Sequence, residues 1–218
     1  MKINDWFRRI VKLVCPPLLI IFFLKIGKII FGKRLFDGDD ALFMREVSLC
    51  RIYGEYGCGQ STMYVLKHSG IHVYCAESSA SWAMKFNHST DRNGSRRIVQ
   101  HIDLGETGDW GRPLSYSHRS QFSSYTDWIW SQDQKPDLVL IDGRFRVCCF
   151  LTSLKFANEG TVILFDDYRD RRHYHIVEKY VSPDETCGRQ SKFIVPPRNK
   201  IDFDELEQDI ASFRLVMD

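Results

Sequence analysis

The chain has 218 residues, of which 44% are hydrophobic and 27% are charged, a composition typical of one folded domain with a sizeable core. This composition excludes an intrinsically disordered or fibrous protein. The formal net charge is only +2, so no global positive field indicates a nucleic-acid partner, and we expect none. The seven cysteines form no Cys-x-x-Cys pair, and several lie in apolar runs, which indicates a reducing and therefore cytoplasmic location.

Positive charge is concentrated at the start of the chain. Residues 1–34 carry eight basic side chains and one acidic side chain, a net charge of +7, whereas the remainder has a net charge of −5. Residues 13–24 are uncharged and mostly apolar, and as a helix they would reach about 18 Å, short of the roughly 30 Å hydrocarbon core of a bilayer. We therefore expect residues 1–36 to form a membrane-proximal helical segment, separate from a domain over residues 37–218.

Within that segment, residues 10–34 combine apolar side chains with lysines three positions apart, a pattern typical of a helix lying in the surface of a membrane. This would place the protein on the cytoplasmic face. A tilted span with lysines reaching the interface, a signal peptide, and a helix that packs on the body or on a partner subunit remain alternatives.

Helical and strand-like patterns alternate along the rest of the chain. A helix is expected over residues 41–47, then a strand over 49–54, a helix over 61–68, a strand over 71–76, a helix over 80–86 and a strand over 98–102. After a long excursion come a strand over 138–141, a crossover helix over 147–157, a strand over 161–165, and further edge strands over 192–195 and 213–217. Continuous apolar runs are typical of buried parallel strands, so the alternation predicts a doubly wound, mostly parallel α/β sheet.

The first strand runs into a glycine-rich turn, residues 55–61 with the sequence EYGCGQS. Gly57 and Gly59 permit a sharp bend and a close approach of the backbone to a ligand, and a helix with free N–H groups follows at Ser61. Glu77 lies just after the second strand, twenty residues after Gly57, where a carboxylate can accept hydrogen bonds from ribose hydroxyls. A nucleotide-type pocket is therefore predicted at this edge of the sheet.

The pattern Glu55-x-Gly57-x-Gly59-x-Ser61 resembles the first motif of class I S-adenosylmethionine-dependent methyltransferases, over about residues 40–180. The resemblance implies a Rossmann-like methyltransferase fold with S-adenosylmethionine as cofactor, bordered by this turn. It also implies that Glu77 holds the ribose and that Asp103, just past the third strand, lies near the adenine. A nicotinamide-dependent oxidoreductase is disfavoured, because the third glycine of dinucleotide-binding enzymes and an obvious Tyr-x-x-x-Lys pair are missing.

Carboxylates follow the next two strands. Asp142 comes directly after the strand over 138–141, and Asp166 and Asp167 come after the strand over 161–165. Their oxygens could hold Mg²⁺, or Asp142 could act directly as a general base. The arrangement is similar to metal-dependent O-methyltransferases of the catechol type, although Asp167 stands where these usually have asparagine. Residues 142–146 (DGRFR) also resemble a little-characterised bacterial methyltransferase-like group.

Basic side chains near this edge are the candidates for binding and proton transfer. Arg144 and Arg146 could clamp a carboxylate or phosphate of the substrate, or they could pair with the nearby aspartates. His173 and His175 could act as catalytic bases near neutral pH, or they could be surface or capping residues at the start of a helix.

The excursion over residues 104–135 is long enough to carry a functional loop. Residues 104–117 are the expected lid, whereas Phe122, Tyr125 and Trp128 recur every three residues, as on the buried face of a helix. The sequence thus predicts methyl transfer to oxygen of a small or saccharide-like acceptor. The alternative is a non-catalytic, membrane-tethered α/β module that recruits a partner in surface-polysaccharide assembly.

Overall fold

The computed structural model describes residues 35–36, 39–68, 70–87 and 97–218. These carry a seven-stranded sheet with the order β3-β2-β1-β4-β5-β7-β6. The strands are β1 (Ile52–Tyr56), β2 (His72–Glu77), β3 (Arg97–His101), β4 (Leu138–Ile141), β5 (Val162–Phe165), β6 (Glu185–Cys187) and β7 (Gln190–Ile194). The expected helix within residues 1–36 lies outside the described residues.

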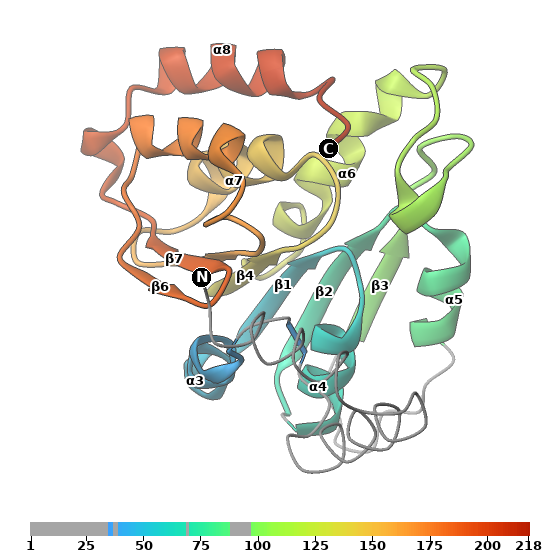
Figure 1. Cartoon of the computed structure of the whole chain (residues 1–218), viewed down its shortest axis with the longest axis horizontal. Coiled ribbons are helices and arrows are strands. Elements are labelled where there is room, and N and C mark those ends of the chain that lie inside the picture. The colour runs from blue at the N-terminus through green and yellow to red at the C-terminus, as the bar shows by residue number, and fades with distance from the viewer. Residues whose placement is uncertain (1–34, 37–38, 69, 88–96) are drawn as a thin grey trace, which may run out of the picture. The chain divides into compact units, whose positions relative to one another are not determined.

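Helices cover both faces of the sheet (Figure 1). One face carries α3 (Ala41–Leu49), α4 (Gln60–His68) and α5 (Ala80–Asn87), and the other carries α6 (Phe122–Asp127), α7 (Arg146–Phe156) and α8 (Phe203–Phe213). Neighbours among β1 to β5 pair in parallel, while β7 pairs antiparallel with β5 and with β6. The predicted doubly wound, mostly parallel α/β sheet is confirmed.

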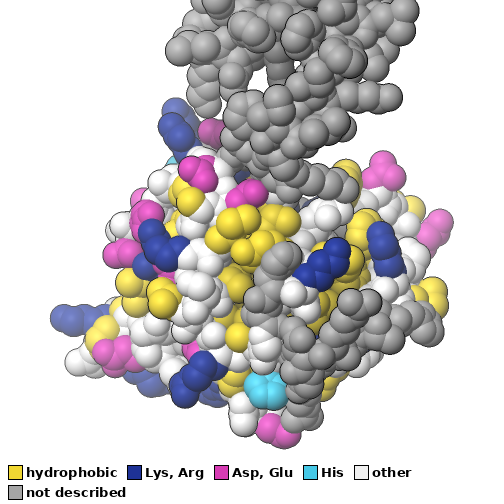
Figure 2. Space-filling model, turned by 90° about the horizontal axis from the view of Figure 1, so that it is seen from below, with side chains coloured by type: hydrophobic (Ala, Val, Ile, Leu, Met, Phe, Trp, Pro, Cys, Tyr) yellow, Lys and Arg dark blue, Asp and Glu magenta, His cyan; other side chains and the backbone are white. Residues whose placement is uncertain are grey.

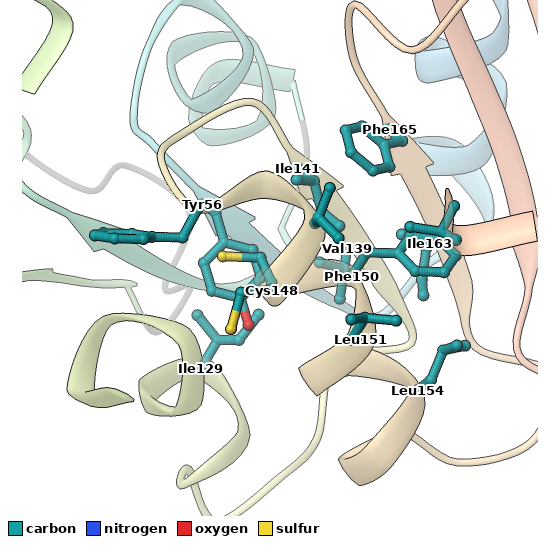
Figure 3. Packing of buried hydrophobic residues seen from close by; sticks show 14 of the residues in the cluster. Tyr56, Ile129, Val139, Ile141, Cys148, Phe150, Leu151, Leu154, Ile163 and Phe165 are labelled. Carbon is teal, nitrogen blue, oxygen red and sulfur yellow. The ribbon is translucent and has the colours of Figure 1, made fainter. Parts of the chain in front are cut away.

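Two parts of the core lie on opposite faces of the sheet. On the α7 face, side chains of β4 and β5 such as Val139 and Ile163 pack against Phe150 and Leu151 of α7 (Figure 3). On the other face a smaller cluster includes Cys75 of β2 and Phe86 of α5. Because β4 is buried on both faces, its four residues are all apolar, and its predicted bounds are confirmed.

The predicted strand over residues 213–217 is wrong. Asp202 caps α8 by accepting hydrogen bonds from the backbone N–H groups of Asp204 and Glu205, at 3.1 Å each. The buried Leu206 and Ile210 lie four residues apart on one face of the helix, so α8 continues to Phe213 and the chain then leaves it without pairing. The strand predicted over 192–195 is confirmed as β7, but β6 lies outside it at the sheet edge.

Among the described residues, no helix is both long and apolar enough to cross a membrane. On the face seen in Figure 2, hydrophobic side chains gather among charged ones of both signs. Charges of neither sign form a continuous patch on the described part of this face.

Candidate active site

The turns after β1 and β4 touch through their backbones. Gly57 has a φ of +86°, and a Cβ built on it would lie 2.6 Å from Cα of Gly143. A Cβ on Gly143 would in turn overlap the Tyr125 hydroxyl and approach the backbone of Tyr56. Only glycine fits at these two positions. Gly59 differs, because the nearest atom to a Cβ there would be Ser61 Oγ at 4.0 Å, which leaves room for a ligand to approach.

Glu55 is fully buried and holds the start of α4. Its carboxylate accepts hydrogen bonds from the hydroxyls of Ser61 and Thr62, the latter at 2.6 Å. Thr62 Oγ1 also accepts a hydrogen bond from the backbone N–H of Gly59, at 2.8 Å. Glu55 and Ser61, both predicted to bind cofactor, therefore point at each other, and in this arrangement they shape the turn from beneath.

Burial raises the pKa of Glu55 to about 8, although the hydrogen bonds from Ser61 and Thr62 oppose this shift. Between its usual pKa of 4.5 and about 8, the folded state binds more protons than the unfolded state, so stability falls as pH rises. Glu55→Gln, which does not titrate, should lack this loss. Relative to wild type, its free energy of unfolding should rise by about 3 kcal/mol between pH 5 and pH 8. Urea unfolding at both pH values measures this difference, and exposed Glu159→Gln is the control. If the free energy of unfolding changes equally with pH in wild type, Glu55→Gln and Glu159→Gln, the prediction is wrong.

Glu77 was predicted just after the second strand and is the last residue of β2, where it is 5% exposed. Its Oε2 accepts hydrogen bonds from the backbone N–H of Cys58 at 2.8 Å and from Cys58 Sγ at 3.1 Å. Its Oε1 accepts a hydrogen bond from the backbone N–H of Ser79, at 2.6 Å. The carboxylate thus joins the glycine turn to the start of α5, and its remaining lone pairs can accept further hydrogen bonds.

The loop over residues 104–117 packs onto this corner. Gly111 is buried with a φ of +70°, and a Cβ there would overlap Ser78 Oγ at the end of β2. The preceding Trp110 is in the left-handed region with a φ of 59° and is 85% exposed. Asp103 is exposed and accepts a hydrogen bond from the backbone N–H of Gly105, at 2.9 Å. In the structure, Asp103 therefore supports the start of the loop.

Arg146, which is 4% exposed, joins the ends of β4 and β5. Its guanidinium donates to Asp142 Oδ1 at 3.0 Å and to the backbone oxygens of Gly143 and Asp166 at 3.1 and 2.9 Å. It also lies 3.4 Å from Asp167 Oδ2. The alternative given above for Arg146, pairing with aspartates, is the one that the structure favours, and this guanidinium is not free to clamp a substrate.

A second arginine neutralises the other carboxylates. Arg189 binds both oxygens of the fully buried Asp166, at 3.0 and 2.6 Å, and lies 3.3 Å from Asp167 Oδ1. Arg171 donates to Asp167 Oδ2 at 2.7 Å. Guanidinium groups thus stand beside Asp142, Asp166 and Asp167, where a cation would have to bind. Within the described residues, no three side chains are placed to hold a metal ion, so the predicted Mg²⁺ site does not fit this structure.

Asp142 differs from its neighbours because 30% of its side chain is exposed at the edge of the sheet. Its pKa is raised to about 7 by the depth of the site and by the negative charge of Asp166, while Arg146 opposes the shift. A carboxyl group with a pKa near neutral pH can exchange a proton with a bound hydroxyl.

Arg144 is a cation of this edge without a partner among the described residues. Its side chain forms no hydrogen bond or ion pair with any described residue, and its Nε is buried. Burial and the nearby charge of Arg146 lower the pKa of Arg144. Its backbone N–H lies 3.2 Å from the Tyr125 hydroxyl, which accepts a hydrogen bond from it. Arg144 thus keeps the capacity to bind an anion that Arg146 has lost.

The two histidines form contacts away from Asp142. They lie in a 3₁₀ helix, η4 (Arg172–Lys179), in which His173 is exposed and packs its ring edge-on against Tyr174. His175 stacks on Tyr168 at 4.7 Å and its Nε2 lies 3.2 Å from the Tyr168 backbone oxygen. The structure does not bring either ring into contact with the predicted base.

Three residues at this edge had no predicted role in it. Tyr125 was expected to lie on a buried helix face, which is confirmed, but its hydroxyl also reaches the turn after β4. Arg189 lies outside every motif. Asp218 Oδ1 accepts a hydrogen bond from the backbone N–H of Arg146 at 3.0 Å and so caps α7. No local signal in the sequence could have indicated these contacts, because each joins distant parts of the chain.

Comparison with known proteins finds solved structures that are similar to this chain. No protein-family model matches the sequence, and no curated protein sequence matches it. A methyltransferase-like protein from Silicibacter pomeroyi DSS-3 is 32% identical, with a TM-score of 0.74 over 84% of this chain and 97% of that protein.

Two further structures have lower sequence identity and lower TM-scores. An RNA methyltransferase from Salinibacter ruber, in complex with S-adenosyl-L-homocysteine, is 13% identical with a TM-score of 0.44, covering 75% of this chain and 98% of its own. A methyltransferase from Pyrococcus furiosus is 13% identical with a TM-score of 0.44, covering 82% and 96%.

Proposed function

This chain belongs to the family of methyltransferase-like proteins represented by the Silicibacter pomeroyi structure, and from that premise we propose that it transfers a methyl group from S-adenosylmethionine to an acceptor. The single observation that carries the proposal is the bridge from Glu77 to the backbone N–H of Cys58. It sets a buried carboxylate against a glycine turn at the carboxyl edge of a parallel sheet, where nucleotide-type ligands bind in such folds.

The residues at this corner fit the cofactor. Glu77 can accept hydrogen bonds from ribose hydroxyls, and Gly59 leaves open space beside the turn. The loop at Gly111 covers the end of β2 and would exclude water from the bound nucleoside. When bound, S-adenosylmethionine supplies a methyl group already activated on a sulfonium, so the protein's work is to align the acceptor and receive its proton.

Asp142 is the proposed proton acceptor. It is the most exposed of the three carboxylates at this edge, and its pKa of about 7 suits a base that works near neutral pH. Arg146 holds its Oδ1 in place. The acceptor is proposed to be a small or saccharide-like molecule methylated on oxygen, and Arg144 could bind an anionic group on it. For His173 and His175, no contact in the structure supports a role as bases.

Calorimetric titration with S-adenosylhomocysteine tests the proposed function. The wild-type protein should bind one equivalent. Glu77→Gln should weaken binding about ten- to a hundredfold, because it removes the charge that receives hydrogen bonds from the ribose. Asp103→Asn should have a smaller effect, since Asp103 is exposed and supports only the loop.

Glu159→Gln is the matched control, because Glu159 is exposed in the connection between α7 and β5, at the opposite edge of the sheet. It should bind like wild type. If a well-folded wild-type protein does not bind S-adenosylhomocysteine, or if Glu77→Gln and Glu159→Gln bind equally well, the transferase assignment fails.

A location on the cytoplasmic face of a membrane is a further part of the proposal. It rests on the basic and apolar pattern of residues 10–34, which lie outside the described residues. Sedimentation with anionic vesicles, compared between the full chain and a chain lacking residues 1–34, tests it. Equal sedimentation of the two would contradict a membrane role for this segment.

A further inference from the structure

A cleft lies between the loop after β3 and the end of α8, away from the glycine turn. It has a volume of about 450 Å³ and is lined by Ser117, Arg119, Ser120, Ala211, Arg214 and Leu215. Beside it, the Tyr116 hydroxyl donates to the backbone oxygen of Leu215 at 3.2 Å and so ties the loop to the chain after α8. The lining combines two arginines with two serines and contains no acidic side chain.

Neither arginine of this cleft is neutralised by a residue that the structure describes. The guanidinium groups of Arg119 and Arg214 form no hydrogen bond or ion pair with any described residue, in contrast to Arg146 and Arg189 at the edge of the sheet. The Nε of Arg214 is buried without a partner. The positive charge of Arg214 thus has no counter-ion among the described residues, so an anionic ligand that accepts from this guanidinium would stabilise the protein.

The donors of the cleft match a tetrahedral oxyanion. Two guanidinium groups offer forked pairs of N–H donors, and the Ser120 hydroxyl has no partner among the described residues. Ser117 Oγ lies 2.9 Å from Ser115 Oγ and 3.0 Å from His118 Nδ1, so its position is set by the loop itself. A lining with two guanidinium groups and a free hydroxyl suits phosphate, which has more acceptor oxygens than a carboxylate.

The cleft is connected to the proposed transfer site by a short stretch of chain. Four residues after Arg214, Asp218 caps α7 through the backbone N–H of Arg146, whose side chain holds Asp142. Four residues of extended chain span at most about 14 Å. The end of the chain accordingly lies between α8 and the carboxyl edge of the sheet in Figure 1. One extended molecule could therefore occupy the cleft and reach Asp142.

We propose that this cleft binds a phosphoryl group, and that the acceptor carries it. The second half rests on the proposed function, because it treats the edge near Asp142 as the site of methyl transfer; the first half does not. The phosphoryl group could belong to a soluble phosphorylated molecule or to a lipid phosphate, and the chemistry of recognition is the same.

Calorimetric titration of the full chain with pyrophosphate at low ionic strength tests the cleft. One equivalent should bind, and Arg119→Gln and Arg214→Gln should each weaken binding on the order of tenfold, as expected when a charge-assisted pair is lost. Arg112→Gln is the control, because Arg112 is an exposed arginine of the same loop that does not line the cleft. It should change the affinity less than twofold. No binding, or equal weakening in all three variants, would overturn the proposal.

Ser120→Asp provides a second test in case the arginine variants do not fold. Ser120 is exposed and its hydroxyl has no described partner, so the added carboxylate should leave the melting temperature unchanged and repel the anion. Normal pyrophosphate binding by this folded variant would also overturn the proposal. Competition between pyrophosphate and vesicles containing phosphatidic acid would indicate a lipid source, and its absence would indicate a soluble one. S-adenosylhomocysteine binding is measured separately: if it fails while pyrophosphate binds, only the role of the cleft as acceptor site is lost.

Discussion

Replacing Gly57 with alanine should abolish S-adenosylhomocysteine binding. The backbone at Gly57 has a φ of +86°, and the added Cβ would lie 2.6 Å from Cα of Gly143. Cα of Gly143 is a main-chain atom, and the added Cβ is bonded directly to the main chain. Neither atom can rotate away, so the turn after β1 must move. That movement would displace the backbone N–H of Cys58 from Glu77 and disrupt the corner that we propose for the ribose. The free energy of unfolding should fall by about 3 kcal/mol.

Gly160→Ala is the control that distinguishes the steric clash of a Cβ at residue 57 from the strain of a positive φ. Gly160 has nearly the same φ, +83°, but a Cβ there would meet no atom within 4 Å. This variant should lose about 1 kcal/mol of stability and bind the cofactor product normally. Calorimetry and urea unfolding on the two variants provide the comparison. Normal binding by Gly57→Ala would show that the turn does not border the cofactor.

Arg146→Met should destabilise the protein by about 3–5 kcal/mol, because it removes a buried cation and leaves carboxylates without compensation. Arg144→Met, two positions earlier, should cost about 1 kcal/mol or less, since Arg144 has no partner among the described residues and its charge is poorly hydrated. Urea unfolding at pH 8 measures both. Equal losses would contradict the role given to Arg146.

Arg146→Met also tests the proposed role of Asp142 as a base. Arg146 lowers the pKa of Asp142, which burial and Asp166 raise, so in Arg146→Met this pKa should rise above about 7. The carbon-13 shift of the Asp142 carboxyl group, followed between pH 4 and pH 9, measures the change. A midpoint that stays the same, or a wild-type midpoint near 4, would remove the argument for Asp142 as a base near neutral pH.

Strand and helix patterns were readable from the sequence because they depend on local order. Residues 138–141 are a continuous apolar run, and such a run is buried on both faces wherever it folds. The glycine turn and Glu77 were located because strand, turn, helix and strand follow one another in the chain. The predicted bounds of an element differ from the observed ones where a neighbouring element is longer than predicted. The first strand begins at Ile52 rather than residue 49, because α3 continues to Leu49.

The partners of the charged side chains were decided only by the tertiary structure. Asp142, Asp166 and Asp167 suggested metal binding from the sequence, yet Arg146 and Arg189 pair with these carboxylates. Arg189 comes from the turn between β6 and β7, which no motif marks. The requirement for glycine at residue 143, in the turn after β4, likewise comes from Tyr125, which lies eighteen residues earlier on α6. A sequence specifies which groups carry charge or bulk, and which secondary structure they favour. Which of them meet depends on how strands far apart in the chain come together, because desolvation and ion pairing act across space.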